Sequence, residues 1–321
     1  MAQRKRFQNS VIIGKFLPPH RGHHFLIESA LRDSENLQVF VCERDTDFLP
    51  AALRAAWLRE IHPRARFTIK TDVYDPNDSQ LWANLTRQWL GFVPDAVWTS
   101  ENYGHTWAKF LGCQHVLVDL ARQNVPISAT KIRENPLETL EFLHPTVRAH
   151  FVKRVVILGA ESTGTTTLAR DLAAHFGTIW VEEYGREFCE KHWSGPHFAH
   201  IAREQGRRED EAAKRAHKLL FCDTNAYATQ FWHERYLGFW SPQLEQIAAR
   251  CRADFYILTG AEIPFVQDGW RDGQHIRAAM HARFEEKLRA QNVPFLLVEG
   301  TRQARLETAA RRVEKLLNRT T

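Results

Sequence analysis

Cysteine is scarce in this sequence, and no two cysteines are close neighbours. Five are scattered along 321 residues (Cys42, Cys113, Cys189, Cys222 and Cys251). An odd number without a C-x-x-C pair argues against a disulfide framework and against a zinc site. We therefore expect buried free thiols in a reducing compartment, and so a cytoplasmic protein.

Long apolar runs and blocks of basic residues are also missing. No stretch approaches 18 uninterrupted apolar residues, so no segment is expected to span a membrane. The basic start of the chain, residues 1–10, precedes an apolar run of only strand length, which is not typical of a signal peptide. A net charge of +5 without a Lys/Arg block suits phosphorylated small ligands and does not predict nucleic-acid binding.

The composition otherwise supports two folded domains. With 44% hydrophobic and 25% charged residues, a chain of this length can build a core in each of two domains. Short apolar runs alternate with helical patterns, which favours an α/β fold with parallel sheets covered on both faces. Residues 134–153 contain two prolines and no strand pattern, so we place the domains at 1–150 and 151–321.

The most informative stretch reads GKFLPPHRGH from Gly14 to His23. A β-branched run, 11–13, predicts a strand before it, and apolar residues at helical spacing predict a helix over 25–31. His20 and His23 then lie near a helix N-terminus, where anions bind, and Lys15 lies beside them. The stretch predicts a phosphate site; a capped surface turn with two exposed histidines is the alternative.

A second stretch reads ISATKIR from Ile127 to Arg133. Ser128 is a suitable helix N-cap, and Arg133 follows in the next turn. By itself this is typical of a capped, solvated helix. Its place after the last strand of the first domain, however, lets it face the opening loop.

Together the two stretches resemble the paired signature of the nucleotidylyltransferases, in the form found in nicotinamide mononucleotide adenylyltransferases. The resemblance implies a Rossmann-like domain in which the mononucleotide's phosphate attacks the α-phosphorus of ATP. Since that nucleophile is already anionic, no general base is needed, and Lys15, His20, His23 and Arg133 would neutralise and align the phosphates, with Mg²⁺. The implied ATP-binding residues are Gly14, Phe16, His20, His23, Ser128, Arg133 and Arg54.

Two of the implied contacts, those of Arg54 and Trp98, have alternatives. Arg54 resembles a family arginine that reaches the phosphates, but a salt bridge is equally compatible with its position. Trp98 and Asn102 end a predicted strand where the nicotinamide nucleotide should lie. Stacking by Trp98 is a hypothesis, because a chain with ten tryptophans needs many of them for its cores.

The second domain opens with another strand–loop–helix pattern. The loop has the spacing of a P-loop and comprises Gly159, Glu161, Ser162, Thr163, Gly164, Thr165, Thr166 and Thr167. Its amides can form an anion-binding nest, and Thr166 occupies the Mg²⁺-ligating position. The lysine is missing, and Thr165 takes its place. The loop therefore lacks the cation that reaches the β- and γ-phosphates.

Two further features of this domain bear on catalysis. Asp223 ends an apolar strand, as a Walker-B carboxylate does, and is a candidate Mg²⁺ ligand; the alternative is a helix cap. Arg271 and Arg277 fall in a stretch that resembles a kinase lid and could replace the missing lysine charge. Solvated lid arginines are the alternative.

The order of the domains and the sequence GAESTG resemble the bifunctional adenylyltransferase/ribosylnicotinamide kinase family (NadR). The resemblance implies that the P-loop domain makes nicotinamide mononucleotide from nicotinamide riboside and that the first domain converts it to NAD. With only about a dozen residues before the first strand, we expect no helix-turn-helix repressor domain. Alternatives are a non-catalytic, regulatory P-loop domain or another nucleotidylyltransferase substrate, of the pantetheine-phosphate or cytidylyl type. The choice between ATP and GTP as phosphate donor, and between a monomer and a homo-oligomer, stays open.

Overall fold

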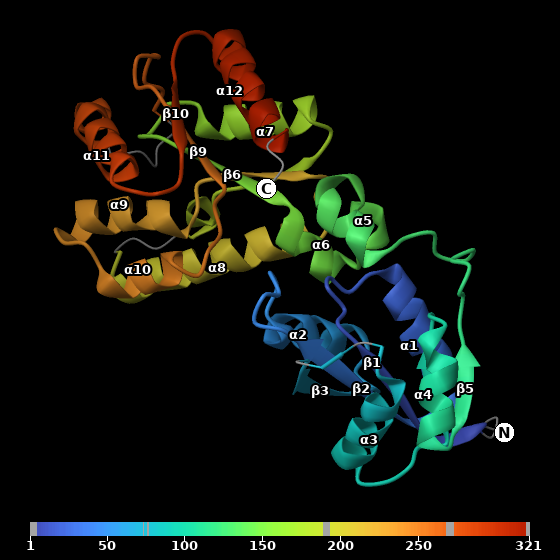
Figure 1. Cartoon of the computed structure of the whole chain (residues 1–321). Coiled ribbons are helices and arrows are strands. Elements are labelled where there is room, and N and C mark those ends of the chain that lie inside the picture. Colours follow the sequence, from blue (N-terminus) through green and yellow to red (C-terminus); the bar gives the residue numbers. More distant parts are fainter. Residues whose placement is uncertain (1–4, 73, 76, 189–192, 268–272, 319–321) are drawn as a thin grey trace. The chain divides into compact units, whose positions relative to one another are not determined.

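The computed structural model describes residues 5–72, 74–75, 77–188, 193–267 and 273–318. The chain divides into two compact units, Met1–Val147 and Arg148–Thr321, each with its own five-stranded parallel sheet (Figure 1). The expected α/β fold with two parallel-sheet domains is confirmed. No helix in the described part of the chain is both long and apolar enough to cross a membrane.

The sheet of the first unit has the strand order β3-β2-β1-β4-β5, which reverses direction between β1 and β4. In such sheets, ligands bind at the carboxyl ends of the strands beside this reversal. The strands are β1 (Phe7–Gly14), β2 (Ser34–Glu43), β3 (Arg66–Thr71), β4 (Ala96–Thr99) and β5 (Gln114–Leu117). The helices are α1 (Arg21–Asp33), α2 (Ala51–Ile61), α3 (Ser79–Leu90), α4 (Tyr103–Leu111) and α5 (Ala129–Glu134), with 3-10 turns at Pro136–Glu138 and Leu140–Phe142. Helix α6 (Pro145–Phe151) includes the boundary between the two units.

Successive side chains of β1 pack alternately into two hydrophobic cores, one on each face of this sheet. Ile12 packs with Ile27 and Leu58, from α1 and α2, on one face. Val11 packs with Trp107 and other residues of α3 and α4 on the opposite face. Because β1 is buried on both faces, the loop that follows it starts from a rigid strand.

The second unit has the strand order β10-β9-β6-β8-β7, with β6 in the centre. The strands are β6 (Lys153–Leu158), β7 (Ile179–Val181), β8 (Leu219–Asp223), β9 (Phe255–Thr259) and β10 (Phe295–Val298). The helices are α7 (Thr165–His175), α8 (Gly195–Ala213), α9 (Ala226–Leu237), α10 (Pro242–Ala248), α11 (Arg277–Arg289) and α12 (Arg302–Leu317), with 3-10 turns at Tyr184–Glu187 and Gln274–Ile276. Helices α7 and α12 cover one face, where Leu168 and Val313 pack against Ile157.

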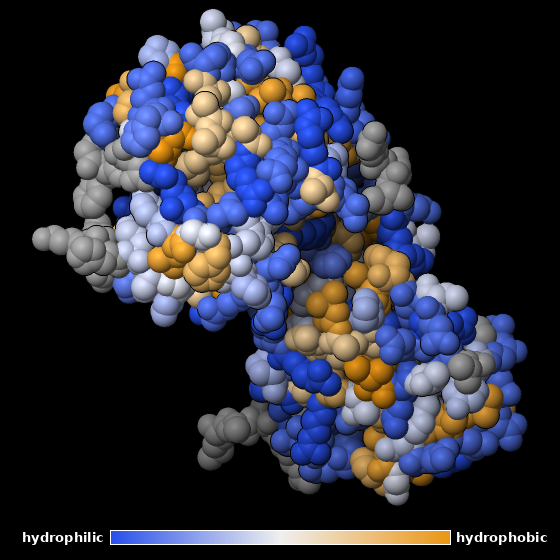
Figure 2. Space-filling view, turned by 90° about the vertical axis from the view of Figure 1, so that its left-hand side faces the viewer, coloured by the Kyte–Doolittle hydropathy of each residue, from blue (hydrophilic) through white to orange (hydrophobic). Residues whose placement is uncertain are grey.

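Two segments differ from regular buried strands and helices. The segment 295–298 is an edge strand in which Val298 is the only fully buried residue. The segments Pro136–Glu138 and Leu140–Phe142 are short 3-10 turns. Hydrophilic residues cover much of the face shown in Figure 2, and apolar side chains are visible there in separate groups.

Candidate functional site

The opening loop leaves β1 at Gly14, at the reversal point of the first sheet. Phe16 follows with a φ of +51° and is buried, 2% exposed. Its ring lies over Gly14, where a Cβ would come within 3.2 Å of the ring. The Phe16 side chain thus packs in the core, so any contact that this residue makes with ATP falls to its backbone.

Two backbone hydrogen bonds fix the tautomers of the histidine pair. His20 is the N-cap of α1, and its Nδ1 accepts from the amide of Gly22 (3.1 Å). The amide of His20 in turn donates to Nδ1 of His23 (3.3 Å), and the two rings stack with centroids 3.7 Å apart. An amide can only donate, so both Nδ1 atoms are acceptors. Each neutral ring therefore carries its proton on Nε2, as a donor for a ligand.

Burial keeps both rings uncharged at neutral pH. It lowers the pKa of His20 to about 4, with a smaller effect from the nearby charge of Arg122. It lowers the pKa of His23 well below its usual value, with additional repulsion from His20, His24 and Arg122. In the free protein the two histidines therefore offer neutral N–H donors at the positive end of α1.

The second stretch meets the opening loop, as expected from its place in the sequence. Ser128 caps α5 by accepting from the amide of Lys131 (3.3 Å). Arg133 Nη1 donates to the carbonyl of Leu17 (2.9 Å), 116 residues earlier in the chain, and Nη2 donates to Thr130 Oγ1 (3.0 Å). Arg133 thus ties α5 to the loop that carries the histidines.

Arg54 supports the opening loop from below instead of reaching into the site. Its fully buried guanidinium donates to the carbonyls of Lys15 and Cys42 and to the Asp47 carboxylate (2.9 Å). Arg54 thus forms the salt bridge that was the alternative interpretation, and its predicted contact with the phosphates of ATP is wrong. The ammonium of Lys15 lies 3.5 Å from the buried carboxylate of Asp72.

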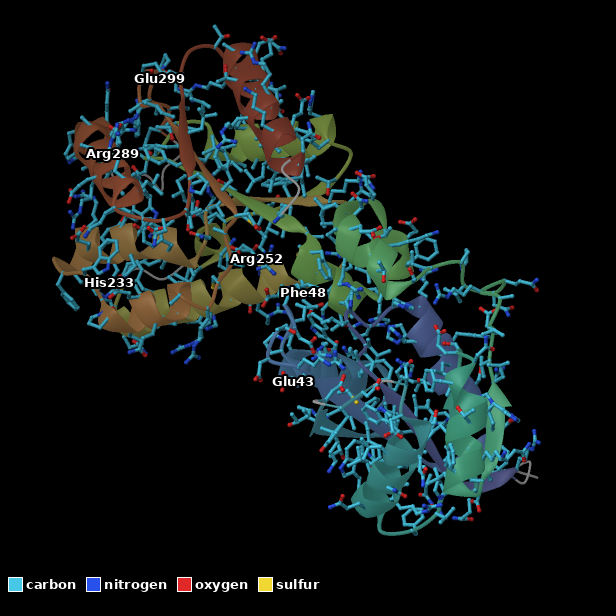
Figure 3. The ribbon with its side chains drawn as sticks, viewed as in Figure 1. Glu43, Phe48, His233, Arg252, Arg289 and Glu299 are labelled. Atoms are coloured by element: carbon cyan, nitrogen blue, oxygen red, sulfur yellow. The ribbon has the colours of Figure 1, made fainter. Side chains whose placement is uncertain are left out.

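The loop between β2 and α2, which follows Glu43 and carries Phe48 (both labelled in Figure 3), holds this arrangement in place. Glu43 at the end of β2 accepts from the amide of Ala51, the first residue of α2 (2.6 Å). Asp47 accepts from the amide of Arg44 (3.1 Å) as well as from Arg54. Phe48, at the tip of this loop, is 53% exposed.

Trp98 belongs to the core, so its predicted stacking on nicotinamide is wrong. The side chain is 2% exposed, its Nε1 donates to Ser10 Oγ (3.1 Å), and its ring meets Phe7 edge to face. Trp98 lies in the middle of β4, where alternate side chains enter the core. Asn102 is exposed at the start of α4, and its contact with the nicotinamide nucleotide stays a prediction.

Sequence reasoning missed Arg122 as a member of this site. Its charge lowers the pKa of both histidines, and its guanidinium pairs with Glu101 after β4 (3.1 Å). Asp119, with a φ of +52°, accepts from the amides of residues 123–125 and shapes the loop that carries Arg122. No motif or periodicity marks this irregular loop in the sequence.

The P-loop of the second unit is built as its spacing predicts. Ser162 and Gly164 have left-handed backbones (φ +57° and +83°), and Gly164 is the N-cap of α7. The first amides of a helix have no acceptor within it, so they are available to an anion. Gly159 must be glycine, because a Cβ there would lie 2.1 Å from Thr259 Oγ1.

Asp223 faces the P-loop from the end of β8. The hydroxyl of Thr166 donates to it, and the side chain of Thr165 is also hydrogen-bonded to it. Burial and the nearby charge of Glu183 raise its pKa to about 6. Asn225, instead of Asp223, caps the following helix, by accepting from the amide of Ala228 (3.1 Å). The capping alternative for Asp223 is therefore excluded.

A cavity of about 580 Å³ adjoins the P-loop and has an aromatic wall. The rings of Trp193 and Tyr236 are nearly parallel, at 8°, with centroids 6.1 Å apart. Other residues that line this cavity are Glu183, Arg186, Phe188, Phe198, Gln205, Thr229 and Trp232. Flat walls with polar groups at one end suit an aromatic nucleoside. Sequence reasoning did not select these aromatics, since nothing distinguishes them from core residues before folding.

The predicted lid arginines have different outcomes. Arg277, at the start of α11, is 5% exposed and donates to the carbonyls of Ile263 (2.9 Å) and Ser162 (3.4 Å). Arg277 therefore binds the main chain of the P-loop. Both earlier interpretations are wrong: its side chain is not solvated, and it is not a mobile cation of a closing lid. Arg271 lies outside the described residues.

The fold and the two loops define a two-domain α/β nucleotide-binding protein with a histidine pair at the N-terminus of one helix and a P-loop at that of another. Residues 154–305 match the AAA domain family AAA_28. The trifunctional NAD biosynthesis/regulator protein NadR of Escherichia coli (strain K12) is 31% identical over 320 residues, or 90% of this chain and 78% of the relative. The protein of the same name from Salmonella typhimurium (strain LT2) is 30% identical over 327 residues, or 92% and 80%. The chain belongs to the NadR family.

Solved structures show the same fold. The crystal structure of a NadR protein in complex with NAD and AMP-PNP has a TM-score of 0.74 at 22% identity. The crystal structure of a NadR protein in complex with NR has a TM-score of 0.79, also at 22% identity. Each comparison covers 98% of this chain and 97% of the other. Each unit therefore has the fold of the corresponding part of a NadR protein.

Proposed function

We propose that the first unit transfers adenylate from ATP to nicotinamide mononucleotide, forming NAD and pyrophosphate. The observation that carries this proposal is the bond from Arg133 to the Leu17 carbonyl, because it joins the two signature stretches at the sheet reversal. The NadR relatives, which are NAD biosynthesis proteins by name, support the choice of substrate.

The proposed reaction needs donors and alignment but no base. A phosphate oxygen of the mononucleotide attacks the α-phosphorus, and the bond from that phosphorus to the pyrophosphate oxygen breaks. The Nε2–H groups of His20 and His23, at the positive end of α1, stabilise the charge on the phosphates. Arg133 lies across the loop from them and adds a fixed cation. Bound Mg²⁺ would neutralise part of the triphosphate charge.

NAD formation from ATP and nicotinamide mononucleotide tests this proposal. We expect His23→Ala to lower kcat about 10²- to 10³-fold, the usual effect of removing one transition-state donor. His105→Ala, an exposed histidine of the same unit, is the matched control and should keep the wild-type rate. Full activity in His23→Ala would refute the role of this ring, and a substrate panel with pantetheine phosphate and CTP would expose a different specificity.

For the second unit we infer phosphorylation of nicotinamide riboside to the mononucleotide. The riboside hydroxyl attacks the γ-phosphorus, ADP leaves, and Asp223 is placed to orient the hydroxyl and take its proton. The aromatic walls formed by Trp193 and Tyr236 suit the nicotinamide ring, and a NadR protein has been crystallised with NR.

Thr166 and Asp223 form the proposed Mg²⁺ site of this unit. In the described residues no group of three or more His, Cys, Asp and Glu side chains could hold a metal ion alone. Kinase magnesium needs only one or two protein ligands, because substrate phosphates supply others. Bound Mg²⁺ would offset the charge that develops on the transferred phosphoryl group.

Turnover of nicotinamide riboside with Mg²⁺ and either ATP or GTP tests the kinase. We expect Asp223→Asn to abolish formation of the mononucleotide and to leave NAD formation by the first unit unchanged. The second candidate function is a non-catalytic, nucleotide-sensing P-loop unit, favoured by Thr165 in the lysine position. Nucleotide binding without turnover, and no turnover in Thr165→Lys either, would select the sensor.

A further inference from the structure

One arginine of the C-terminal helix lies directly beneath the P-loop. Arg305 of α12 is 4% exposed. Its Nη1 donates to the carbonyl of Thr163 (2.6 Å), and its Nη2 donates to the carbonyl of Gly260 (3.0 Å) and to Glu262 Oε1 (2.6 Å). Its Nε donates to the carbonyl of Gly300 (3.1 Å). The guanidinium thus joins the P-loop to the loops that follow β9 and β10.

The Thr163 carbonyl is a sensitive place for a charged donor. It shares its peptide group with the amide of Gly164, the N-cap residue of α7. A cation bonded to the carbonyl polarises that peptide group, so its N–H becomes a stronger donor to an anion above the loop. The preceding carbonyl, of Ser162, accepts from Arg277 (3.4 Å). Two successive peptide groups of the nest are therefore polarised from below.

This loop lacks the usual cation on its ligand side. Thr165 stands in the lysine position and is hydrogen-bonded to Asp223. We propose that Arg305 is a positioning residue of the P-loop, which fixes the Thr163 carbonyl and supplies from beneath the loop part of the positive potential that a lysine would supply from above. The proposal rests on the proposed function only in that the P-loop binds the phosphates of a nucleotide.

The charge of Arg305 can be tested separately from its bonding. Glu262 accepts from Arg305 and from the amide of Gly300 (2.6 Å), and its side chain is 40% exposed. Glu262→Gln keeps an oxygen acceptor for both donors and removes the negative charge beside the guanidinium. A purely structural clamp would gain nothing from this change, whereas a source of potential would bind anions more tightly.

Calorimetric titration of the full chain with Mg·AMP-PNP measures this potential. Both units can bind this nucleotide, so the part of the binding signal that Gly159→Ala removes is assigned to the P-loop. We expect Arg305→Lys to weaken this component about tenfold or more, as for a lost charged hydrogen bond, and Glu262→Gln to tighten it. The matched control is Arg302→Ala, an exposed arginine of the same helix paired with Asp171. Unchanged affinity in Arg305→Lys, or affinity not above wild type in Glu262→Gln, overturns the proposal.

The variant Thr165→Lys, which restores the usual lysine of a P-loop, allows a second binding experiment. With Thr165→Lys as background, Arg305→Lys should cost clearly less affinity than in the wild type, because the two cations act on the same phosphates. Equal costs in both backgrounds contradict the proposal. Should Arg305→Lys fail to fold, Glu262→Gln still decides. Binding that behaves as expected without riboside turnover would refute the kinase while leaving this inference standing.

Discussion

At the scale of single residues, burial decides what the side chains selected by motif can do. His20 and His23 are placed as the motif predicts, but burial and their backbone bonds make them neutral Nε2–H donors. Arg54 and Trp98 have the residue types of ligand contacts but lie inside the protein. A sequence pattern identifies a residue's chemistry, and its exposure is known only after packing.

Acid should destabilise the first unit through a buried histidine pair behind the site. His24 Nδ1 lies 2.9 Å from His62 Nε2, and burial lowers the pKa of His24 to about 3 and that of His62 to about 4. His144, His20 and Arg21 face His24 and add repulsion. The unfolded chain therefore binds more protons between these values and about 6.5, so stability falls as pH drops through this window.

Urea unfolding between pH 7.5 and pH 5 measures this effect. Below pH 6.5 the first unit should lose about 1.4 kcal/mol of unfolding free energy per pH unit for each histidine that stays neutral. In His24→Gln the unfolding free energy should depend less on pH, because this variant lacks one histidine whose protonation is suppressed in the folded protein. A wild-type profile that is flat over this range would contradict the prediction.

The core position of Trp98 gives another prediction at this scale. Trp98→Ala should lower the unfolding free energy by about 3–5 kcal/mol, as for other large core aromatics. Trp98→Phe should cost less and leave the KM for nicotinamide mononucleotide unchanged, because no stacking is lost. Asn102→Ala, at the exposed end of the same segment, is the comparison variant, expected to raise this KM. A large KM increase in Trp98→Phe would restore the stacking hypothesis.

At the scale of elements, strands were easier to predict than helices. The apolar run 11–13 lies within β1, and the strand predicted before the P-loop is β6 (Lys153–Leu158). Helices α8 to α11 were not predicted. The buried face of α8 includes Gln205, Gly206 and Glu209, so its periodicity is masked by polar residues that find partners only in the folded unit.

The cap of α5 should control adenylyl transfer, because this helix has only six residues. Ser128→Ala removes a cap worth about 1 kcal/mol, which should fray the helix, loosen Arg133 from Leu17 and reduce kcat about fivefold. Ser128→Asn retains a capping side chain and should recover most of the rate. Steady-state kinetics decide: an Asn variant as slow as the Ala variant would show that the hydroxyl itself is required.

At the scale of the whole molecule, each unit has its own sheet, core and site. Substitutions in one site should therefore leave the chemistry of the other intact. Gly159→Ala should abolish riboside phosphorylation, because its Cβ would clash with Thr259 Oγ1, and leave NAD formation from the mononucleotide unchanged. His23→Ala should do the reverse. Loss of both activities in either variant would contradict independence of the sites.

Separate cores also predict two unfolding transitions in calorimetry. Nicotinamide riboside, as a ligand of the second unit only, should raise the temperature of one transition and leave the other in place. Asp223→Asn should keep both transitions, since it removes a carboxylate whose pKa is already raised by burial. A single transition that shifts as a whole would show that the units unfold together.

The sequence by itself determined the two parallel-sheet domains, the two phosphate loops and the family, because strand–loop–helix patterns and glycine spacing are local properties of the chain. Only the tertiary structure decided that Arg54 and Trp98 are internal and that the histidines are neutral. It also placed Arg122 near the histidines, and the aromatic side chains and Arg305 beside the P-loop. Each of these outcomes depends on burial or on contacts between distant segments. Charge state and exposure are set by what packs around a side chain, and residue order alone does not contain them.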